Sequence, residues 1–262
     1  MMDYALTNGR ERIQFGEDFV LLSVSEGPTE IKGEENGILD GFGYNSLGAR
    51  FGGKALTLSG YIVGSDIANK KRLLNRITTP SVDYFYLEKG TTQLKCRLHR
   101  GIEYGEKKHS REKTLSFKIT LFAPYPVWEE KTEIKNTYYS LSSASGEDGP
   151  IIIQNEGDVR TGFLLRMVFL VDADYIELML EDKLITIKGA FTTGDSFYID
   201  TRRGQERAYV VFKNTTTEIN GMKYITLDSE LFKLEPGENS IGYELYGGAA
   251  HMEITYKQGY LL

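Results

Sequence analysis

The stretch TLSFKITLFAPYPVWEE, residues 114–130, divides this chain of 262 residues. Its first half has an apolar side chain at every second position, which predicts a half-buried strand. Two prolines follow and exclude both a helix and a central strand, because proline lacks an N–H and fixes φ. The only tryptophan, Trp128, comes next. We interpret the stretch as a stiff connector between two β-rich domains, residues 1–131 and 132–262. An edge strand that ends in a proline turn inside one domain is the alternative.

The composition favours a mainly β protein, since glycines and aromatics are plentiful and helix-period patterns are scarce. The single cysteine, Cys96, excludes an intramolecular disulfide, and its strand spacing predicts a place in the core. We find no signal-peptide pattern and no apolar run long enough to span a bilayer. We therefore expect a soluble protein, made in a reducing cytoplasm, without a membrane partner.

The net charge of −6 is unevenly distributed. Residues 1–131 carry 19 Lys and Arg against 17 Asp and Glu, whereas residues 132–262 carry 12 against 20. Neither half is basic enough for tight binding to duplex DNA, and the acidic second half would repel phosphate. We expect no specific nucleic-acid binding.

The first half predicts five strands, at residues 19–24, 56–63, 84–87, 92–98 and 114–122. It also predicts one helix, residues 67–77, which Ser65 or Asp66 would cap through a side-chain oxygen. Thr79 precedes a proline and should end this helix. We interpret the basic residues of the helix as a solvated face and not as a phosphate site.

Residues 25–53 contain eight glycines and show no sustained period. Structureless loops of this length are uncommon in compact domains, and a disordered one would not carry side chains such as Ile38, Phe42 and Tyr44. We expect an extended arm or hairpin that packs on something, such as another subunit. A local Ω-loop over its own domain is the alternative.

A second basic segment, residues 95–118, holds eight Lys and Arg against three Glu and should form a long hairpin. Such a hairpin can contact an acidic protein surface or nucleic acid. We favour protein, because no aromatic ladder for base stacking separates the charges; a solvated hairpin of mixed charge is the alternative. Its candidate contact residues are Arg97, Arg100, Lys107, Lys108 and Arg111.

The second half predicts a loop at residues 138–149 and then nine short strands, at residues 151–154, 163–171, 175–180, 184–187, 197–200, 208–212, 224–227, 241–245 and 252–256. Asp182-Lys183 and Asn220-Gly221 are signals for tight hairpins, and Pro236-Gly237 for a type II turn. Many short strands at this spacing predict an antiparallel β-sandwich.

No catalytic, cofactor or metal site emerges from the motifs. The histidines show no ligand spacing and accompany no cysteine cluster, and no phosphate-binding glycine motif lies between a strand and a helix. Gly194-Asp195-Ser196 resembles the nucleophile block of one hydrolase class, but a strand follows it where that class has a helix. A carboxylate pair for glycoside hydrolysis stays open, because its separation is a three-dimensional quantity.

Two ordered sets of motifs resemble one family. The first set comprises Asp40-Gly41, Tyr44, Gly48-Ala49-Arg50, residues 56–60, the predicted helix 67–77 with Thr79-Pro80 after it, and residues 122–128. The second comprises residues 189–201, 231–241 and 252–260. Their order is similar to that of the distal tail proteins of bacteriophages with long, non-contractile tails, and of the related prophages. Residues 51–54, Phe-Gly-Gly-Lys, depart from the alternation that we expect there.

The resemblance implies a structural protein of the virion tail tip, assembled in the host cytoplasm and not an enzyme. It implies a ring-forming N-terminal domain, six copies of which close around the end of the tail tube, and a galectin-like C-terminal β-sandwich. The implied partners are the major tail protein, the tail-associated hub protein and, at the periphery, receptor-binding or baseplate proteins.

The predicted fold class is therefore mainly β, with one short helix and an arm in the first domain and a sandwich in the second. The arm and the basic hairpin are best suited to reach a neighbouring subunit, so we add Ile38, Phe42, Tyr44 and Arg50 to the candidate contact residues. A carbohydrate-binding module that recognises a cell-wall glycan is the main alternative function, and a glycoside hydrolase is a second.

Overall fold

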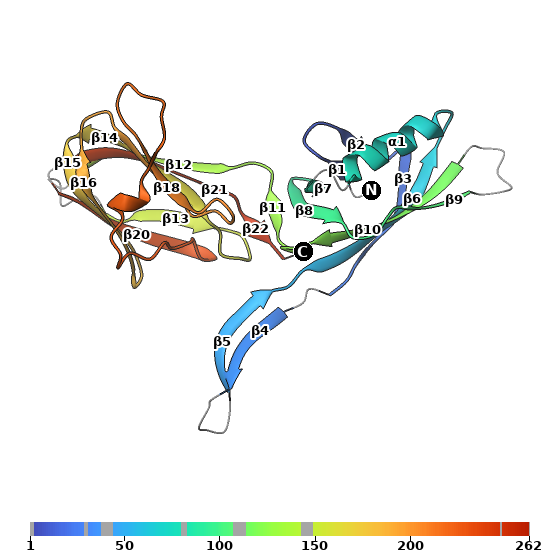
Figure 1. Ribbon diagram of the computed structural model, residues 1–262, viewed down its shortest axis with the longest axis horizontal. Helices are drawn as coiled ribbons and strands as arrows, with labels where there is room; N and C mark the ends of the chain where they lie inside the picture. The colour runs from blue at the N-terminus through green and yellow to red at the C-terminus, as the bar shows by residue number, and fades with distance from the viewer. Residues whose placement is uncertain are drawn as a thin grey trace. The chain divides into compact units, whose positions relative to one another are not determined.

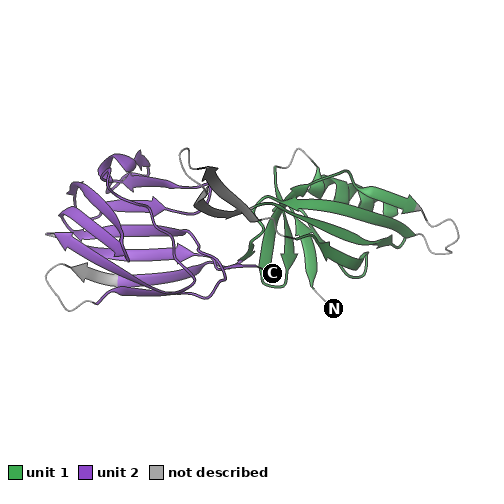
Figure 2. Ribbon diagram, turned by 90° about the horizontal axis from the view of Figure 1, so that it is seen from below, with its two compact units in different colours: residues 1–129, 262 green, residues 130–261 purple. Residues whose placement is uncertain are grey.

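The computed structural model describes residues 3–28, 31–37, 44–79, 83–106, 114–142, 149–246 and 248–261. The chain is mainly β, as its sequence predicts, and divides into two compact units, residues 1–129 with 262 and residues 130–261 (Figures 1 and 2). Within the described ranges, no helix has the length and apolar character needed to cross a membrane.

In its described residues, unit 1 contains one α-helix, α1 (Ile67–Thr78), and eleven strands that begin within it. The strands are β1 (Tyr4–Thr7), β2 (Arg12–Gln14), β3 (Phe19–Glu26), β4 (Ile31–Gly37), β5 (Tyr44–Phe51), β6 (Lys54–Val63), β7 (Phe85–Lys89), β8 (Thr92–Leu98), β9 (Glu103–Glu106), β10 (Thr114–Ala123) and β11 (Trp128–Glu130).

The main sheet of unit 1 follows the order β2-β1-β7-β8-β10-β6-β3, with β9 also paired to β10. Its longest pairing joins β6 and β10 along their whole length, from Lys54 opposite Ala123 to Val63 opposite Thr114. The alternation that predicts β10 places Phe117, Ile119 and Leu121 in the core. Cys96 is buried there too, as expected.

Helix α1 covers one face of this sheet (Figure 1) and buries Leu74 and Ile77. It ends as the sequence predicts, because Thr79 before the proline is extended, with ψ 142°. The predicted cap is wrong in detail. Asp66 is the N-cap residue but makes no side-chain bond to the helix backbone; its carboxylate instead accepts a hydrogen bond from Asn69 Nδ2, at 2.9 Å.

The glycine-rich segment expected to form an extended arm or hairpin contains a two-stranded ribbon, β4–β5, which we call the arm. Its register runs from Ile31 opposite Phe51 to Gly37 opposite Tyr44. Among the described residues, the arm pairs with no other strand, and Figure 1 draws it beyond the adjoining ends of β3 and β6. The prediction of an arm is therefore kept, but its structure is a β-ribbon.

Unit 2 contains a 3₁₀ turn, η2 (Met222–Tyr224), and eleven further strands. They are β12 (Ile134–Ser142), β13 (Ile151–Asn155), β14 (Phe163–Val171), β15 (Ala173–Leu180), β16 (Lys183–Phe191), β17 (Ser196–Asp200), β18 (Arg207–Val211), β19 (Ile219–Asn220), β20 (Gly237–Tyr246), β21 (Ala249–Tyr256) and β22 (Gly259–Tyr260).

Two antiparallel sheets make the predicted sandwich. One has the order β12-β21-β14-β17-β18-β19 and the other β13-β20-β15-β16. Their inner faces share one core, in which Phe169 of the first sheet stacks on Phe191 of the second, with 4.7 Å between ring centroids. The galectin-like character of this sandwich stays a prediction.

Four local predictions for unit 2 are wrong. Asn220-Gly221 forms no tight hairpin, because Asn220 ends β19 and Gly221, with φ −86°, leads into the 3₁₀ turn η2. Residues 138–142 belong to strand β12 and not to a loop, and residues 224–227 form no strand, since η2 and a single bridge from Ile225 to Ile187 occupy that region. The β15–β16 hairpin turns one residue earlier than predicted, because Leu180 pairs with Lys183 and Glu181 takes the left-handed φ of 55°.

Candidate assembly surfaces

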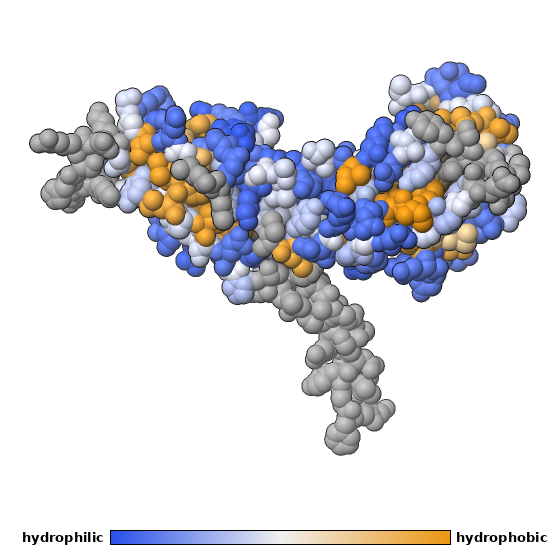
Figure 3. All heavy atoms as spheres, turned by 180° about the vertical axis from the view of Figure 1, so that it is seen from behind, coloured by the Kyte–Doolittle hydropathy of each residue, from blue (hydrophilic) through white to orange (hydrophobic). Residues whose placement is uncertain are grey.

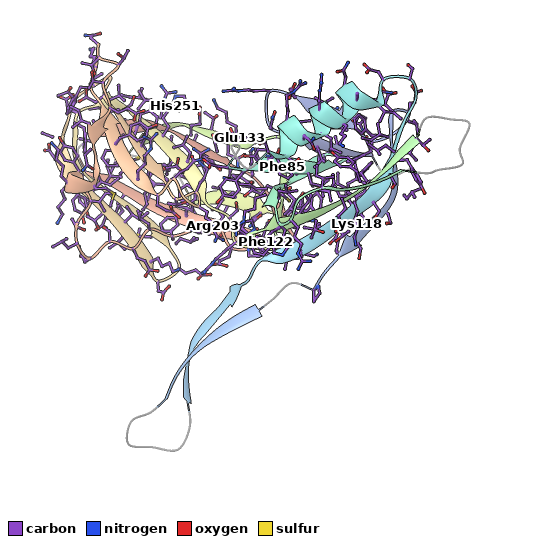
Figure 4. All side chains as sticks on the ribbon, turned by 45° about the vertical axis from the view of Figure 1, so that its right-hand side comes forward. Phe85, Lys118, Phe122, Glu133, Arg203 and His251 are labelled. Atoms are coloured by element: carbon purple, nitrogen blue, oxygen red, sulfur yellow. The ribbon has the colours of Figure 1, made fainter. Side chains whose placement is uncertain are left out.

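The main sheet of unit 1 has one core face and one outer face. Strand β10 alternates between them, so Lys118 and Phe122 project from the side opposite to its buried residues. Figure 4 shows both on the side of the sheet turned away from α1, whereas Phe85 lies between the sheet and the helix. The outer face is otherwise lined by small polar residues of β6 and β10, among them Thr57, Ser59 and Thr120. This polar surface is not part of the hydrophobic core of unit 1.

Positive charge on this outer face has no acidic partner within the described residues. Arg97 lies opposite Phe122 in register, and its guanidinium is 5.1 Å from the ring. Lys95 lies over Tyr84, at 4.4 Å from the ring centroid. Neither these two cations nor Lys118 forms an ion pair in the part of the chain that the structure describes. We call Lys95, Arg97, Lys118 and Phe122 the cationic face.

Four other cations of unit 1 form ion pairs within the unit: Arg12–Glu88, Lys54–Glu26, Lys70–Asp18 and Arg76–Glu11. Lys70 and Arg76 of α1 thus meet acidic side chains of their own unit, which agrees with the solvated basic face that the sequence predicts. The cationic face gathers three cations that form no ion pair among the described residues, and it therefore suits an acidic partner.

The sheet that carries the cationic face has open edges. Strand β3 pairs only with β6, and β9 only with β10, among the described residues, so each leaves one side of its backbone unpaired. A bulge between Leu21 and Ser23 turns the side chain of Leu22 outward, with 61% of it exposed. Unpaired strand edges of this kind can accept a strand from another chain.

The arm leaves the sheet between the end of β3 and the start of β6, and we call this junction the root of the arm. Lys54 and Glu26 lie on either side of it and form an ion pair of 2.5 Å, in which Lys54 is only 8% exposed. The Gly27 N–H donates to the Ala55 carbonyl at 2.9 Å. The root thus fixes where the arm leaves the sheet.

The predicted contact residues are only partly brought together. Arg97 lies on the cationic face, and Arg100 is exposed just beyond β8. Tyr44 and Arg50 lie on β5, at the two ends of the arm strand. The remaining five lie outside the described residues: Ile38, Phe42, Lys107, Lys108 and Arg111.

Sequence reasoning did not select Lys118 and Phe122 as candidate contact residues. The signal was available, since Phe122 falls out of phase with the apolar alternation of β10 and therefore belongs to its outer face. His99 stacks on the same ring, with 5.8 Å between centroids. Its ring contact gives this histidine a packing role.

The hydrolase-like motif, Gly194-Asp195-Ser196, has a structural role in unit 2. The buried carboxylate of Asp195 accepts hydrogen bonds from the N–H groups of Thr192 and Lys213, both at 2.8 Å. Burial raises the pKa of Asp195, but these bonds and one from the Thr192 hydroxyl outweigh it, so the pKa lies below its ordinary value. Asp195 closes the turn before β17, and Ser196 is buried on that strand.

Within the described residues, no group of three or more His, Cys, Asp or Glu side chains could hold a metal ion. The face of the molecule in Figure 3 is mainly hydrophilic, with smaller hydrophobic areas. Exposed apolar side chains such as Leu22, Ile152 and Tyr246 contribute to the surface of the chain.

Three comparisons with known proteins bear on identity. Residues 156–260 match the family model for the siphovirus-type tail component, C-terminal domain. No curated protein matches the sequence. Among solved structures, the Dit protein of phage SPP1, described as a paradigm of the hub adsorption apparatus in phages that infect Gram-positive bacteria, matches with a TM-score of 0.70 and 13% identity over 98% of both chains.

The baseplate of phage P2 in its activated conformation with Ca contains a chain that matches with a TM-score of 0.52 and 11% identity, again over 98% of both chains. These two likenesses show a shared fold that extends over both units. The matched domain lies within unit 2. Residues 156–260 therefore match the siphovirus-type tail component family, and the resemblance to the distal tail proteins that the sequence predicts is confirmed.

Proposed function

We propose that this chain is a structural protein of the phage tail tip, where six copies close into a ring. The ring joins the major tail protein of the tube to the tail-associated hub protein, and holds receptor-binding or baseplate proteins at its periphery. The tail-component domain in unit 2 and the shared fold with SPP1 Dit support this role. The chain acts by binding and not by catalysis.

The pair of open edges on one sheet carries this proposal. Strands β3 and β9 lie on opposite sides of the β6–β10 pair. A closed ring needs a head-to-tail contact, in which two different surfaces of each subunit meet. Strand addition between β3 of one copy and β9 of the next would supply such a contact through main-chain hydrogen bonds.

The cationic face supplies a second contact. Lys95, Arg97 and Lys118, which form no ion pair with any described residue, suit an acidic surface, either on the adjacent subunit or on the hub protein. Because exposed charges are screened within about 8 Å at physiological ionic strength, added salt should weaken this contact. A ring whose stability did not depend on salt would contradict this part of the proposal.

Glycan recognition by unit 2 is less well supported. A sugar ring needs an exposed aromatic face, and unit 2 contains no tryptophan. Tyr198 and Tyr209 stack on each other, with 4.4 Å between centroids, and Arg207 lies over the outer face of Tyr209. These two tyrosines therefore expose their edges more than their faces.

Mass photometry and negative-stain imaging of the purified chain test the ring. We expect a six-subunit particle in the wild type. Leu22→Lys should reduce assembly, because it places a charge on the open edge of β3. Leu227→Lys is the matched control, since Leu227 is fully exposed in unit 2 and away from that edge. A wild-type chain that stays monomeric at all concentrations, alone and with its tail partners, would overturn the proposal.

A further inference from the structure

One outer row of side chains crosses the whole six-stranded sheet of unit 2. In register from β19 to β12, the row contains Asn220, Tyr209, Tyr198, Arg166, Glu253 and Thr137. Tyr198 and Tyr209 stack nearly parallel, with 6° between their planes. The guanidinium of Arg166 lies 5.9 Å from the Tyr198 ring. Buried residues of the same strands, such as Phe197 and Ile199, anchor the row on the core, so it is already ordered before any partner binds.

The free polar groups of this row are hydrogen-bond donors. Acidic side chains on this face are already paired with a cation: Glu253 with Lys135, Glu218 with Arg207 and Asp200 with Arg202. In contrast, the Arg166 guanidinium and the hydroxyls of Tyr198 and Tyr209 make no hydrogen bond or ion pair with any described residue. The row therefore needs a partner that supplies acceptors, and carboxylates suit a guanidinium best.

The outer face of the other sheet carries the complementary chemistry. Glu177 of β15 lies directly opposite Glu244 of β20, and like charges in this position destabilise a sheet. Neither carboxylate forms an ion pair within the described residues. Each instead accepts a hydrogen bond from a tyrosine on its own strand: Glu177 from Tyr175 and Glu244 from Tyr246. Lys188 lies over the Tyr175 ring, at 5.3 Å, and not against either carboxylate.

We propose that these two faces meet between neighbouring copies of the chain, with the Arg166 row of one unit 2 packed on the Glu177–Glu244 face of the next. The contact is head-to-tail, as a ring requires, because it uses two different surfaces of the same domain. Arginine would relieve the repulsion between the two carboxylates, and the two tyrosine pairs would supply contact area that is typical of interfaces. This inference rests on the proposed ring.

Charge reversal on the full-length chain tests the contact. Arg166→Glu should raise the protein concentration at which the assembly dissociates by about tenfold or more, and Glu177→Arg with Glu244→Arg should do the same. The triple variant, which exchanges the charges of the two faces, should return this concentration to within about threefold of the wild type. Mass photometry at low ionic strength measures all four proteins.

Two controls match these changes. Arg160→Glu reverses an exposed arginine of unit 2 outside the row, and Glu238→Arg reverses an exposed glutamate on β20, six positions before Glu244. Neither should shift the assembly. Arg166→Gln and Glu177→Gln with Glu244→Gln repeat the test without a new charge, and thermal unfolding of each variant confirms that it is folded.

The results separate this contact from the ring itself. If the wild type assembles and Arg166→Glu assembles equally well, the row does not bind a second copy, although the ring stands; a different protein would then be its occupant. If the loss of affinity in the triple variant equals the sum of the losses in Arg166→Glu and in Glu177→Arg with Glu244→Arg, the two faces do not meet each other. The inference is then wrong. A wild type that never assembles removes both the ring and this contact.

Discussion

The ring of Phe122 occupies the space beside the α-carbon of Gly53. A β-carbon built on Gly53 would lie 2.0 Å from Cζ of Phe122, closer than any side chain tolerates. Gly53 lies in the two-residue link between β5 and β6, and Phe122 lies on the outer face of β10. The departure at residues 51–54 from the expected alternation thus has a steric cause, because the link passes against an aromatic ring that is out of phase with its own strand.

Gly53→Ala should destabilise unit 1 by about 1–3 kcal/mol, because the ring or the link must move to admit the methyl group. Phe122→Leu combined with Gly53→Ala should recover part of the loss. Urea unfolding measures both changes. Gly101→Ala is the control, since a β-carbon there meets no atom within 4 Å. Equal stability of the two alanine variants would contradict the steric argument.

Lys54→Met should destabilise the root of the arm by about 1–3 kcal/mol, because it leaves the Glu26 carboxylate without its cation in a partly buried site. The double variant Lys54→Met with Glu26→Met should be closer to the wild type, since it removes both charges. A double-mutant cycle in urea measures the coupling. Additive losses would show that the pair does not contribute as a unit.

Asp195 should make unit 2 sensitive to acid. Its pKa in the folded state is depressed below the unfolded value of about 3.9, so ionised Asp195 contributes stability above about pH 4 that is lost as the pH falls further. Asp195→Asn should cost about 1–3 kcal/mol near neutral pH, because one bond to the turn is lost. Unfolding free energies measured from about pH 6 to pH 3 should fall less steeply in this variant. An unchanged slope would contradict this assignment.

Cys96 should be unreactive in the folded protein. Burial raises the pKa of its thiol to about 12, against a smaller lowering effect of a hydrogen bond with the Leu87 backbone. A thiol reagent at about pH 8 should therefore label the native chain very slowly and label it fully in concentrated guanidinium chloride. Rapid labelling of the native chain would show that β8 opens locally.

Strand positions are predicted most accurately from the sequence where a strand has one buried face and one exposed face. The alternation of residues 114–122 places β10 within one residue of its observed end, and the proline after Thr79 places the end of α1 correctly. The arm strands were missed because their glycine-rich, polar sequence shows no sustained apolar alternation. At residues 224–227, apolar side chains suggested a strand, but Tyr224 packs against Phe191 from a 3₁₀ turn.

The candidate surfaces were harder to predict than the fold. Basic residues are visible in the sequence, but whether each is neutralised depends on register and on distant partners. Arg76 meets Glu11 across 65 positions, whereas Lys118 and Arg97 meet no carboxylate among the described residues. The stacked tyrosines of unit 2 come from different strands, so only the pairing of β17 with β18 brings Tyr198 to Tyr209.

The attachment of the arm to β6 has a mechanical consequence. Tension on the arm would load β6 along its own axis, where it is held on both sides by β10 and β3. Bonds loaded in shear must break together, whereas a strand peeled from its end gives way one bond at a time. A subunit built in this way can transmit force through the arm without unravelling from its edge.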